Sequence, residues 1–221
     1  MSQRTARSKN ARAPQSPVDR SRGRAEKSAA RRDAIIAAAL DEFAARGFAA
    51  ARLDDVARRA GVAKGTIYLH FRDKEALFQE IVRAILSPTV GMLEQALQSD
   101  MPVRVVVERL LEVFVRDVIG TRRKDVIRLI ISEGGRFPNL AEFYHREILS
   151  RVMNAVRALM ARAYERGEIK SDALARFPQL LGAPGIVAIV WDSLFEKYEP
   201  LDAEAFMRAY VDLLFGERRA A

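Results

Sequence analysis

The amino-acid sequence predicts an all-α protein with two parts, a small N-terminal three-helix domain that contains a helix-turn-helix and a larger helical domain behind it, about nine helices in total. Three observations predict this architecture. Apolar residues recur at steps of three and four, glycine and proline separate the periodic segments, and no segment alternates as a strand does. Hydrophobic residues make up 49% of the 221 residues, enough to bury a sizeable core.

The first three predicted helices lie close together in the sequence. Residues 29–46 carry an apolar face, and Ser28 before it and Gly47 after it mark a helix start and stop. Residues 53–60 and 64–71 predict two short helices on either side of a glycine. This arrangement is typical of a helix-turn-helix.

Longer helices are predicted for the rest of the chain. Asp73 predicts the N-cap of a fourth helix that runs toward residue 98, with a kink near Pro88. Asn139 and Glu142 have the spacing of a capping box. The remaining five helices are predicted at residues 102–120, 122–133, 139–166, 171–200 and 202–216.

The positive charge of the chain is concentrated at its N-terminal end. Of the formal net charge of +8, residues 1–28 hold +6, from eight basic and two acidic side chains, and residues 29–73 hold +2, from eight and six. Clustered Lys and Arg displace counterions from a phosphate backbone, which predicts a polyanion partner. An anionic membrane surface, or a solvated tail with no partner, remains open from charge alone.

Composition argues against several other classes of protein. The chain has no cysteine, and its only histidines are His70 and His145, with no zinc-type spacing and no phosphate-binding glycine loop. We therefore expect no enzyme activity, no metal and no cofactor. The longest apolar run, residues 180–191, is broken by Gly and Pro and is shorter than a membrane helix needs. We expect a cytoplasmic protein with no membrane partner.

The pair of short helices has the residue types that a helix-turn-helix needs. Gly61 suits a left-handed backbone position in the turn, where a side chain would cost roughly 1 kcal/mol. Ala57 is small enough for the second helix to cross closely. Four apolar side chains are predicted to fix the crossing: Val56, Val62, Ile67 and Phe71.

The second short helix is predicted to read DNA. Its eight residues make a rod of about 12 Å, which fits a major groove of about 12 Å. Lys64 and Thr66 can reach base edges or phosphates, and Leu69 can lie on thymine methyls. The full set of predicted DNA contacts, with flanking backbone contacts at both ends, is Arg52, Lys64, Gly65, Thr66, Tyr68, Leu69, His70 and Lys74.

The segment from Leu53 to Phe78, LDDVARRAGVAKGTIYLHFRDKEALF, resembles the DNA-binding signature of the TetR/AcrR family of regulators. The preceding FAARGF is similar to the end of that family's first helix, and the strong match covers residues 31–80. The resemblance implies a homodimer that binds a palindromic operator, usually as a repressor, and leaves it when a small molecule enters the C-terminal domain. It also implies DNA contacts at Lys64, Gly65, Thr66, Tyr68, His70 and Lys74.

The sequence departs from the family pattern at two helix-capping positions. Arg52 and Ala63 stand where the family commonly has Ser or Thr, and losing such a cap costs about 1 kcal/mol. Arg52 exchanges the cap for a candidate phosphate contact. The basic extension of 28 residues is also longer than in many members.

Two further sites are predicted in the C-terminal part, although core packing alone could explain both. An apolar ligand pocket between helices is predicted from Phe114, Leu129, Glu133, Phe143, Tyr144, His145, Val152, Val156 and Trp191. A homodimer interface on the last two helices is predicted from Leu181, Val187, Val190, Leu194, Phe206, Tyr210 and Leu213.

We therefore expect a flexible basic extension at residues 1–28, a DNA-binding domain at 29–75 and a ligand-binding and dimerisation domain at 76–221. The predicted function is that of a sequence-specific transcription regulator, most simply a ligand-released repressor. The alternatives are a non-specific DNA or anionic-surface binder that uses the basic extension and, less favoured by the residues, an enzyme.

Overall fold

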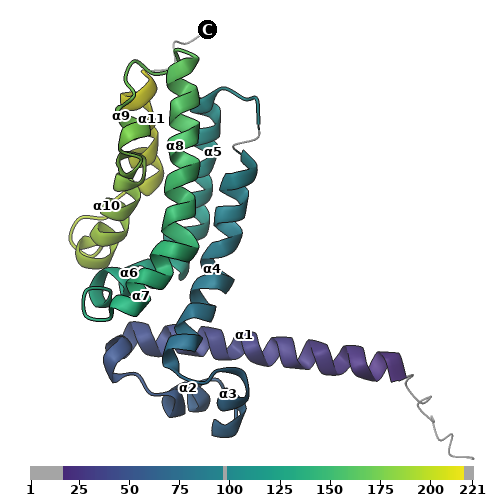
Figure 1. The fold of residues 1–221 in the computed structure, drawn as a ribbon. Helices are drawn as coiled ribbons and strands as arrows, with labels where there is room; N and C mark the ends of the chain where they lie inside the picture. Colours follow the sequence, from purple (N-terminus) through teal and green to yellow (C-terminus); the bar gives the residue numbers. More distant parts are fainter. Residues whose placement is uncertain (1–16, 97–98, 217–221) are drawn as a thin grey trace, which may run out of the picture.

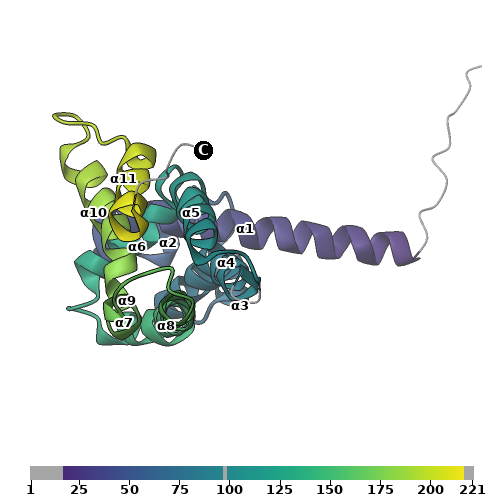
Figure 2. The ribbon, with the colours of Figure 1, turned by 90° about the horizontal axis from the view of Figure 1, so that it is seen from above.

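The computed structural model describes residues 17–96 and 99–216, which contain helices and no strand. Helices α1 (Pro17–Ala50), α2 (Leu53–Arg59) and α3 (Lys64–His70) form a head at one end of an elongated helical body (Figure 1). Helix α4 (Lys74–Ala96) leads from the head into the body. The N-terminal half of α1 projects away from both (Figures 1 and 2).

The body is a bundle of helices that run mostly along its long axis. Helices α4, α5 and α8 lie side by side, and α10 and α11 pack together at one edge (Figures 1 and 2). Two short π-helical segments, η1 and η2, continue α5 and α7. The elements are α5 (Val103–Phe114), η1 (Val115–Ile119), α6 (Arg123–Glu133), α7 (Pro138–Tyr144), η2 (His145–Leu149), α8 (Ser150–Glu165), α9 (Ala173–Arg176), α10 (Gln179–Phe195) and α11 (Ala203–Phe215).

Two of the helix boundaries predicted from the sequence are wrong. Helix α1 begins at Pro17 rather than after Ser28, so the predicted flexible extension is helical from Pro17 onward; its first 16 residues lie outside the described part. The helix predicted at 171–200 is divided into α9 and α10. Phe177 between them is in a non-helical conformation, as is common for a residue that precedes a proline, here Pro178.

The predicted N-caps have a mixed outcome. The Asp73 carboxylate accepts a hydrogen bond from the Ala76 amide at 2.7 Å, so this cap is confirmed. Asp202 caps α11 in the same way, accepting from the Ala205 amide at 2.9 Å. The capping box at Asn139 is wrong: α7 begins with Pro138 at its first turn and has no side-chain cap. A proline at this position needs no amide partner, which removes the demand for the cap.

Helix α4 continues through Pro88 as one element, and the kink predicted there stays a prediction. It is long and apolar enough to cross a membrane by length and composition. Its apolar side chains are instead used inside the protein, since the buried set on α4 packs into the protein's core: Leu77, Phe78, Ile81, Val82, Leu86, Val90 and Leu93.

The core of the head continues into the body through Phe48. Its ring contacts Phe43 of α1, Phe78 of α4 and Phe137 before α7, with centroid distances of 5.3, 6.0 and 5.0 Å. One buried cluster therefore contains residues of α1 to α4 together with residues of α6, α7 and η2. Head and body share a hydrophobic core rather than touching only at their surfaces.

Gly47 sets the direction of the chain that brings Phe48 into this core. Its φ of +73° lies in the region that favours glycine, and it ends the regular part of α1 as predicted. A Cβ built here would lie 2.6 Å from Oε1 of Glu133 at the end of α6. The backbone conformation therefore favours glycine, and a side chain here would also have to displace the Glu133 carboxylate.

We predict that Gly47→Ala lowers the free energy of unfolding by about 1–3 kcal/mol, because a side chain at positive φ is strained and meets Glu133. Urea unfolding followed by circular dichroism measures the change. Gly91→Ala is the matched control: this glycine lies inside α4 with no heavy atom within 4 Å of its Cβ position, so alanine should be neutral or stabilising. Equal losses of stability in the two variants would contradict the assignment.

Candidate nucleic-acid interface

The turn between α2 and α3 ends α2 with two specific backbone hydrogen bonds. The Gly61 amide donates to the Arg58 carbonyl at 3.3 Å, and the Val62 amide donates to the Ala57 carbonyl at 3.0 Å. These are the two bonds of a Schellman motif, which places its glycine at positive φ. Gly61 has a φ of +67°, so the predicted role of this glycine is confirmed.

Four apolar side chains hold the two short helices against α1 and α4. Val56 and Ile67 are fully buried, Phe71 is nearly so, and Val62 packs against the same cluster. Ala57 is buried as well, consistent with the close crossing expected of it. The predicted inner face of both helices is therefore the observed one.

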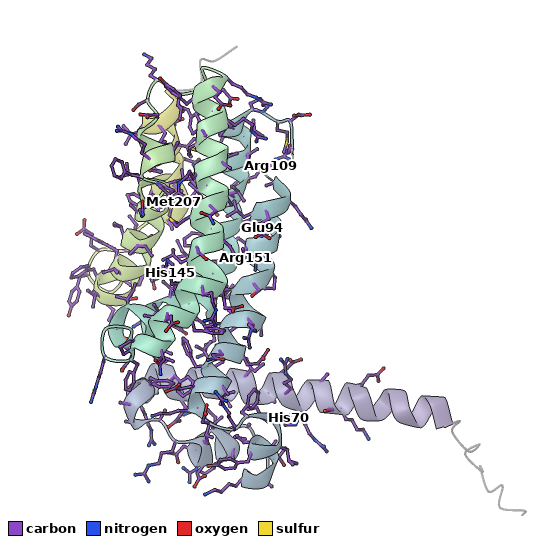
Figure 3. The ribbon with its side chains drawn as sticks, in the orientation of Figure 1. His70, Glu94, Arg109, His145, Arg151 and Met207 are labelled. Carbon is purple, nitrogen blue, oxygen red and sulfur yellow. The ribbon has the colours of Figure 1, made fainter. Side chains whose placement is uncertain are left out.

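The opposite face of α3 is open to solvent. Lys64, Gly65, Tyr68, Leu69 and His70 are exposed, and Thr66 is half-buried. Leu69 is 85% exposed, which is unusual for a large apolar side chain on a rigid helix. Figure 3 marks His70 on this helix. The predicted outward set thus lies together on one surface of the head, and Arg52 is exposed at the start of α2.

Neither short helix has a side-chain N-cap. Arg52 and Ala63 occupy the two N-cap positions in extended conformation and make no capping hydrogen bond. Both helices therefore lack a side-chain cap, as the sequence predicted. Their stability must come from the buried residues on their inner faces.

Lys64 is held by an acidic neighbour that the sequence did not single out for this role. Its Nζ lies 2.7 Å from Oδ2 of Asp54 on α2, and this hydrogen bond raises the pKa of Lys64. Both side chains are more than half exposed, so water screens the pair. Any other anion that binds Lys64 would have to displace Asp54.

Lys74 does not point outward in this structure. Its Nζ donates to the carbonyls of Phe48 and Ala49 at 2.8 and 2.9 Å and lies 4.7 Å from the Phe48 ring centroid. It satisfies carbonyls at the end of α1 and joins them to α4. The geometry assigns Lys74 to supporting the head, whereas the sequence predicted a grip on the DNA backbone.

A charged cluster between α1, α2 and the start of α6 connects these helices. The Glu42 carboxylate is only 2% exposed and forms ion pairs with Arg46 at 2.8 Å and with Arg59 of α2 at 3.2 Å. Asp41, one residue earlier, pairs with Arg122 just before α6. Removing one partner of a buried pair leaves an uncompensated charge, so this cluster fixes the orientation of α2 on α1.

The predicted ligand-pocket residues are only partly brought together. Tyr144 and Val152 pack against the shared core that contains Leu129 and Phe143, and burial raises the pKa of Tyr144 to about 12. Val156 and Phe114 belong to two other clusters. The remaining three point elsewhere: His145 is exposed (Figure 3), Glu133 faces Gly47, and the Trp191 indole donates to the Glu199 carbonyl at 2.7 Å. A hollow of about 790 Å³ between α5 and α11 includes none of the nine.

The predicted dimer residues divide into two groups. Leu181 is buried in its own chain, Phe206 packs against another core cluster, and the Tyr210 hydroxyl donates to the Leu180 carbonyl at 2.5 Å. Leu181 is therefore turned inward, whereas Phe206 and Tyr210 are half-buried, and their place in an interface stays a prediction. Val187, Val190, Leu194 and Leu213 remain between 36% and 84% exposed.

An exposed short helix after a glycine turn, supported by a buried apolar face, defines a helix-turn-helix DNA-binding protein. Residues 35–81 match the family described as "Bacterial regulatory proteins, tetR family", and residues 102–214 match the "Tetracyclin repressor-like, C-terminal domain". The chain belongs to the TetR family. It is a DNA-binding transcriptional regulator and not an enzyme.

Individual relatives agree with this assignment. The regulator AcrR of Shigella flexneri is 30% identical over 197 residues, covering 83% of this chain and 86% of AcrR. The repressor BepR of Brucella suis is 32% identical over 149 residues, covering 64% and 69%. Two solved structures share the fold: FadR of Bacillus subtilis with stearoyl-CoA (TM-score 0.67, 20% identity, 84% and 98% covered) and NalD of Pseudomonas aeruginosa (0.66, 24%, 86% and 98%).

We predict that Asp54→Asn tightens DNA binding roughly two- to fivefold, because Lys64 is freed from its competing partner and the surface no longer carries a negative charge that repels phosphates. Fluorescence anisotropy with a labelled duplex measures the affinity. Asp33→Asn removes an equal charge from the exposed side of α1 and is the control for net charge alone. If Asp54→Asn and Asp33→Asn increased the affinity for DNA by the same factor, the competition between Asp54 and DNA for Lys64 would be contradicted.

Proposed function

We propose that this protein is a homodimeric repressor that binds a palindromic operator through α3 and is released by a small-molecule effector bound in its helical body. The exposed face of α3, set on a head whose core continues into the body, carries this proposal. The cytoplasm, where bacterial DNA is accessible, is the proposed site of action. The relatives BepR and NalD, which are named as repressors, favour repression over activation.

Within this proposal the residues of the head have different tasks. Lys64 and Thr66 reach base edges, and Leu69 lies against thymine methyls, which explains a large apolar side chain left 85% exposed. Tyr68, His70 and Arg52 contact phosphates, and Gly65 lets the backbone approach closely. Lys74 acts indirectly, by holding the end of α1 against α4.

The effector would act through the core that head and body share. Phe137 precedes α7 and contacts Phe48 in the head, and Leu129 of α6 belongs to the same cluster. A ligand that displaces α6 or α7 would therefore move packed residues of the head. The FadR structure holds stearoyl-CoA, which supports a small-molecule site in a body of this fold, and we place it beside Leu129, Phe143, Tyr144 and Val152.

Selection of binding sites from a random DNA pool tests the proposal as a whole. We expect a palindromic consensus bound at least 10³-fold more tightly than scrambled DNA. Recovery of no consensus, with binding that depends only on salt, would favour the alternative of a sequence-blind binder that uses its basic N-terminal residues.

We predict that Thr66→Ala and Lys64→Ala each weaken binding to the selected operator roughly tenfold or more, because each removes a side chain that reaches a base, while scrambled DNA is affected less. Both positions are on the outward side of α3, so the circular dichroism spectrum and melting temperature should stay unchanged. A double variant that keeps wild-type operator affinity would exclude α3 as the recognition helix.

We predict that Val187→Asp produces monomers with weak operator binding, because a charge in an apolar interface is strongly unfavourable and a monomer cannot bind the second half-site. Val187 is 48% exposed in the chain alone, so the fold itself should tolerate aspartate. Met92→Asp on α4, at 47% exposure, is the matched control and should remain dimeric. Sedimentation velocity distinguishes the two, and a wild-type monomer would disprove the dimer.

A further inference from the structure

The N-terminal part of α1 buries almost nothing among its described side chains. Eighteen residue steps separate Pro17 from Ile35, the first buried residue among those described, which makes a rod of about 27 Å. From Glu26 to Ala34 every side chain is exposed except the half-buried Arg32, which pairs with Glu80 of α4. Figures 1 and 2 show this rod leaving the head on the side where α3 lies.

The charges of the rod are sorted by helix face. Arg20, Arg24, Lys27 and Arg31 follow one another at steps of four, three and four, so the helical register places these positions in one row, the basic stripe. The acidic residues of the same segment repeat every seven residues and lie in a different row: Asp19, Glu26 and Asp33. Four of the six basic positions between residues 17 and 34 thus share one row, and no acidic position of this segment lies in that row.

The row that carries the basic stripe faces the DNA-binding side of the head. Continued at the same spacing, it passes through Ile35 and Ala38, both buried, to Glu42. The Glu42 carboxylate forms an ion pair with Arg59 of α2 at 3.2 Å, so this row of α1 faces α2. By helical register, the positions of the basic stripe therefore share the row of α1 that meets α2. The rod that carries them extends past the end of α3 (Figure 1).

We propose that the basic stripe on α1 binds the phosphate backbone of the DNA that flanks each operator half-site; this rests on the proposed DNA-binding function. Its partner is double-stranded DNA because the stripe is continuous with the recognition surface and of opposite charge to phosphate. A rod of about 27 Å covers most of one helical turn of DNA, which is about 34 Å long. An isolated helix of this length is only marginally stable in water, and contact with phosphates would stabilise it.

The experiment measures operator affinity across a range of salt with the full-length protein. The fourfold variant Arg20→Gln, Arg24→Gln, Lys27→Gln, Arg31→Gln should make the slope of log affinity against log salt shallower by about 0.9 for each phosphate that is no longer neutralised. The affinities for operator and for scrambled DNA should fall by similar factors, since phosphate contacts carry little sequence information. A duplex cut at the operator boundary should remove the difference between variant and wild type.

Two controls separate the stripe from total charge and from a flexible arm. Arg24→Gln and Arg22→Gln remove equal charges two positions apart, but Arg22 lies on the other side of the helix, so only Arg24→Gln should change the slope. Ala29→Pro keeps every charge and breaks the rod. It should reduce the slope as well, whereas a flexible arm would keep it.

The outcomes distinguish this proposal from the function on which it rests. Equal salt slopes for wild type and the fourfold variant, or equal effects of Arg22→Gln and Arg24→Gln, would overturn the basic stripe while operator selection by α3 stands. A wild-type protein that selects no operator would instead overturn the proposed function. Circular dichroism and sedimentation confirm that each variant keeps its fold and oligomeric state.

Discussion

The packing of Phe48 is the interaction on which the rest of the structure depends. Gly47 turns the chain at a φ of +73°, and Phe48 then enters a space bounded by rings from α1, α4 and the segment before α7. Lys74 lies over the same ring and binds the carbonyls of Phe48 and Ala49. Phe48 thus packs α1 against α4 and joins the head to the body.

Helix α3 depends on the packing of the head for its stability. A seven-residue helix is too short to be stable in water, and α3 lacks a side-chain cap as well. It keeps its shape because Ile67 and Phe71 are buried against α1 and α4. The outward residues are then free to be chosen for DNA rather than for stability, and Leu69 can remain exposed where a packed helix would bury it.

The sequence predicted the head well because its signals are local. The turn at Gly61, the cap at Asp73 and the inward positions of Ile67 and Phe71 depend on neighbours a few residues away. The Lys64–Asp54 pair and the inward side chain of Lys74 could not be predicted, because they join residues 10 and 25 or more positions apart. In the body, periodicity identified apolar faces but could not say which of three cores each face enters.

The start of α1 was missed for a different physical reason. Sequence periodicity detects helices by the apolar face that they bury, and the rod before Ile35 buries none among its described side chains. Its helical pattern is carried mainly by charge instead, with four basic positions in one row and three acidic positions in another. Such a segment gives no apolar signal at helical spacing, and its described side chains contribute little to the protein's core. The DNA contact proposed for the basic stripe would supply a stabilisation that this core does not, because a helix without a buried face is only marginally stable in water.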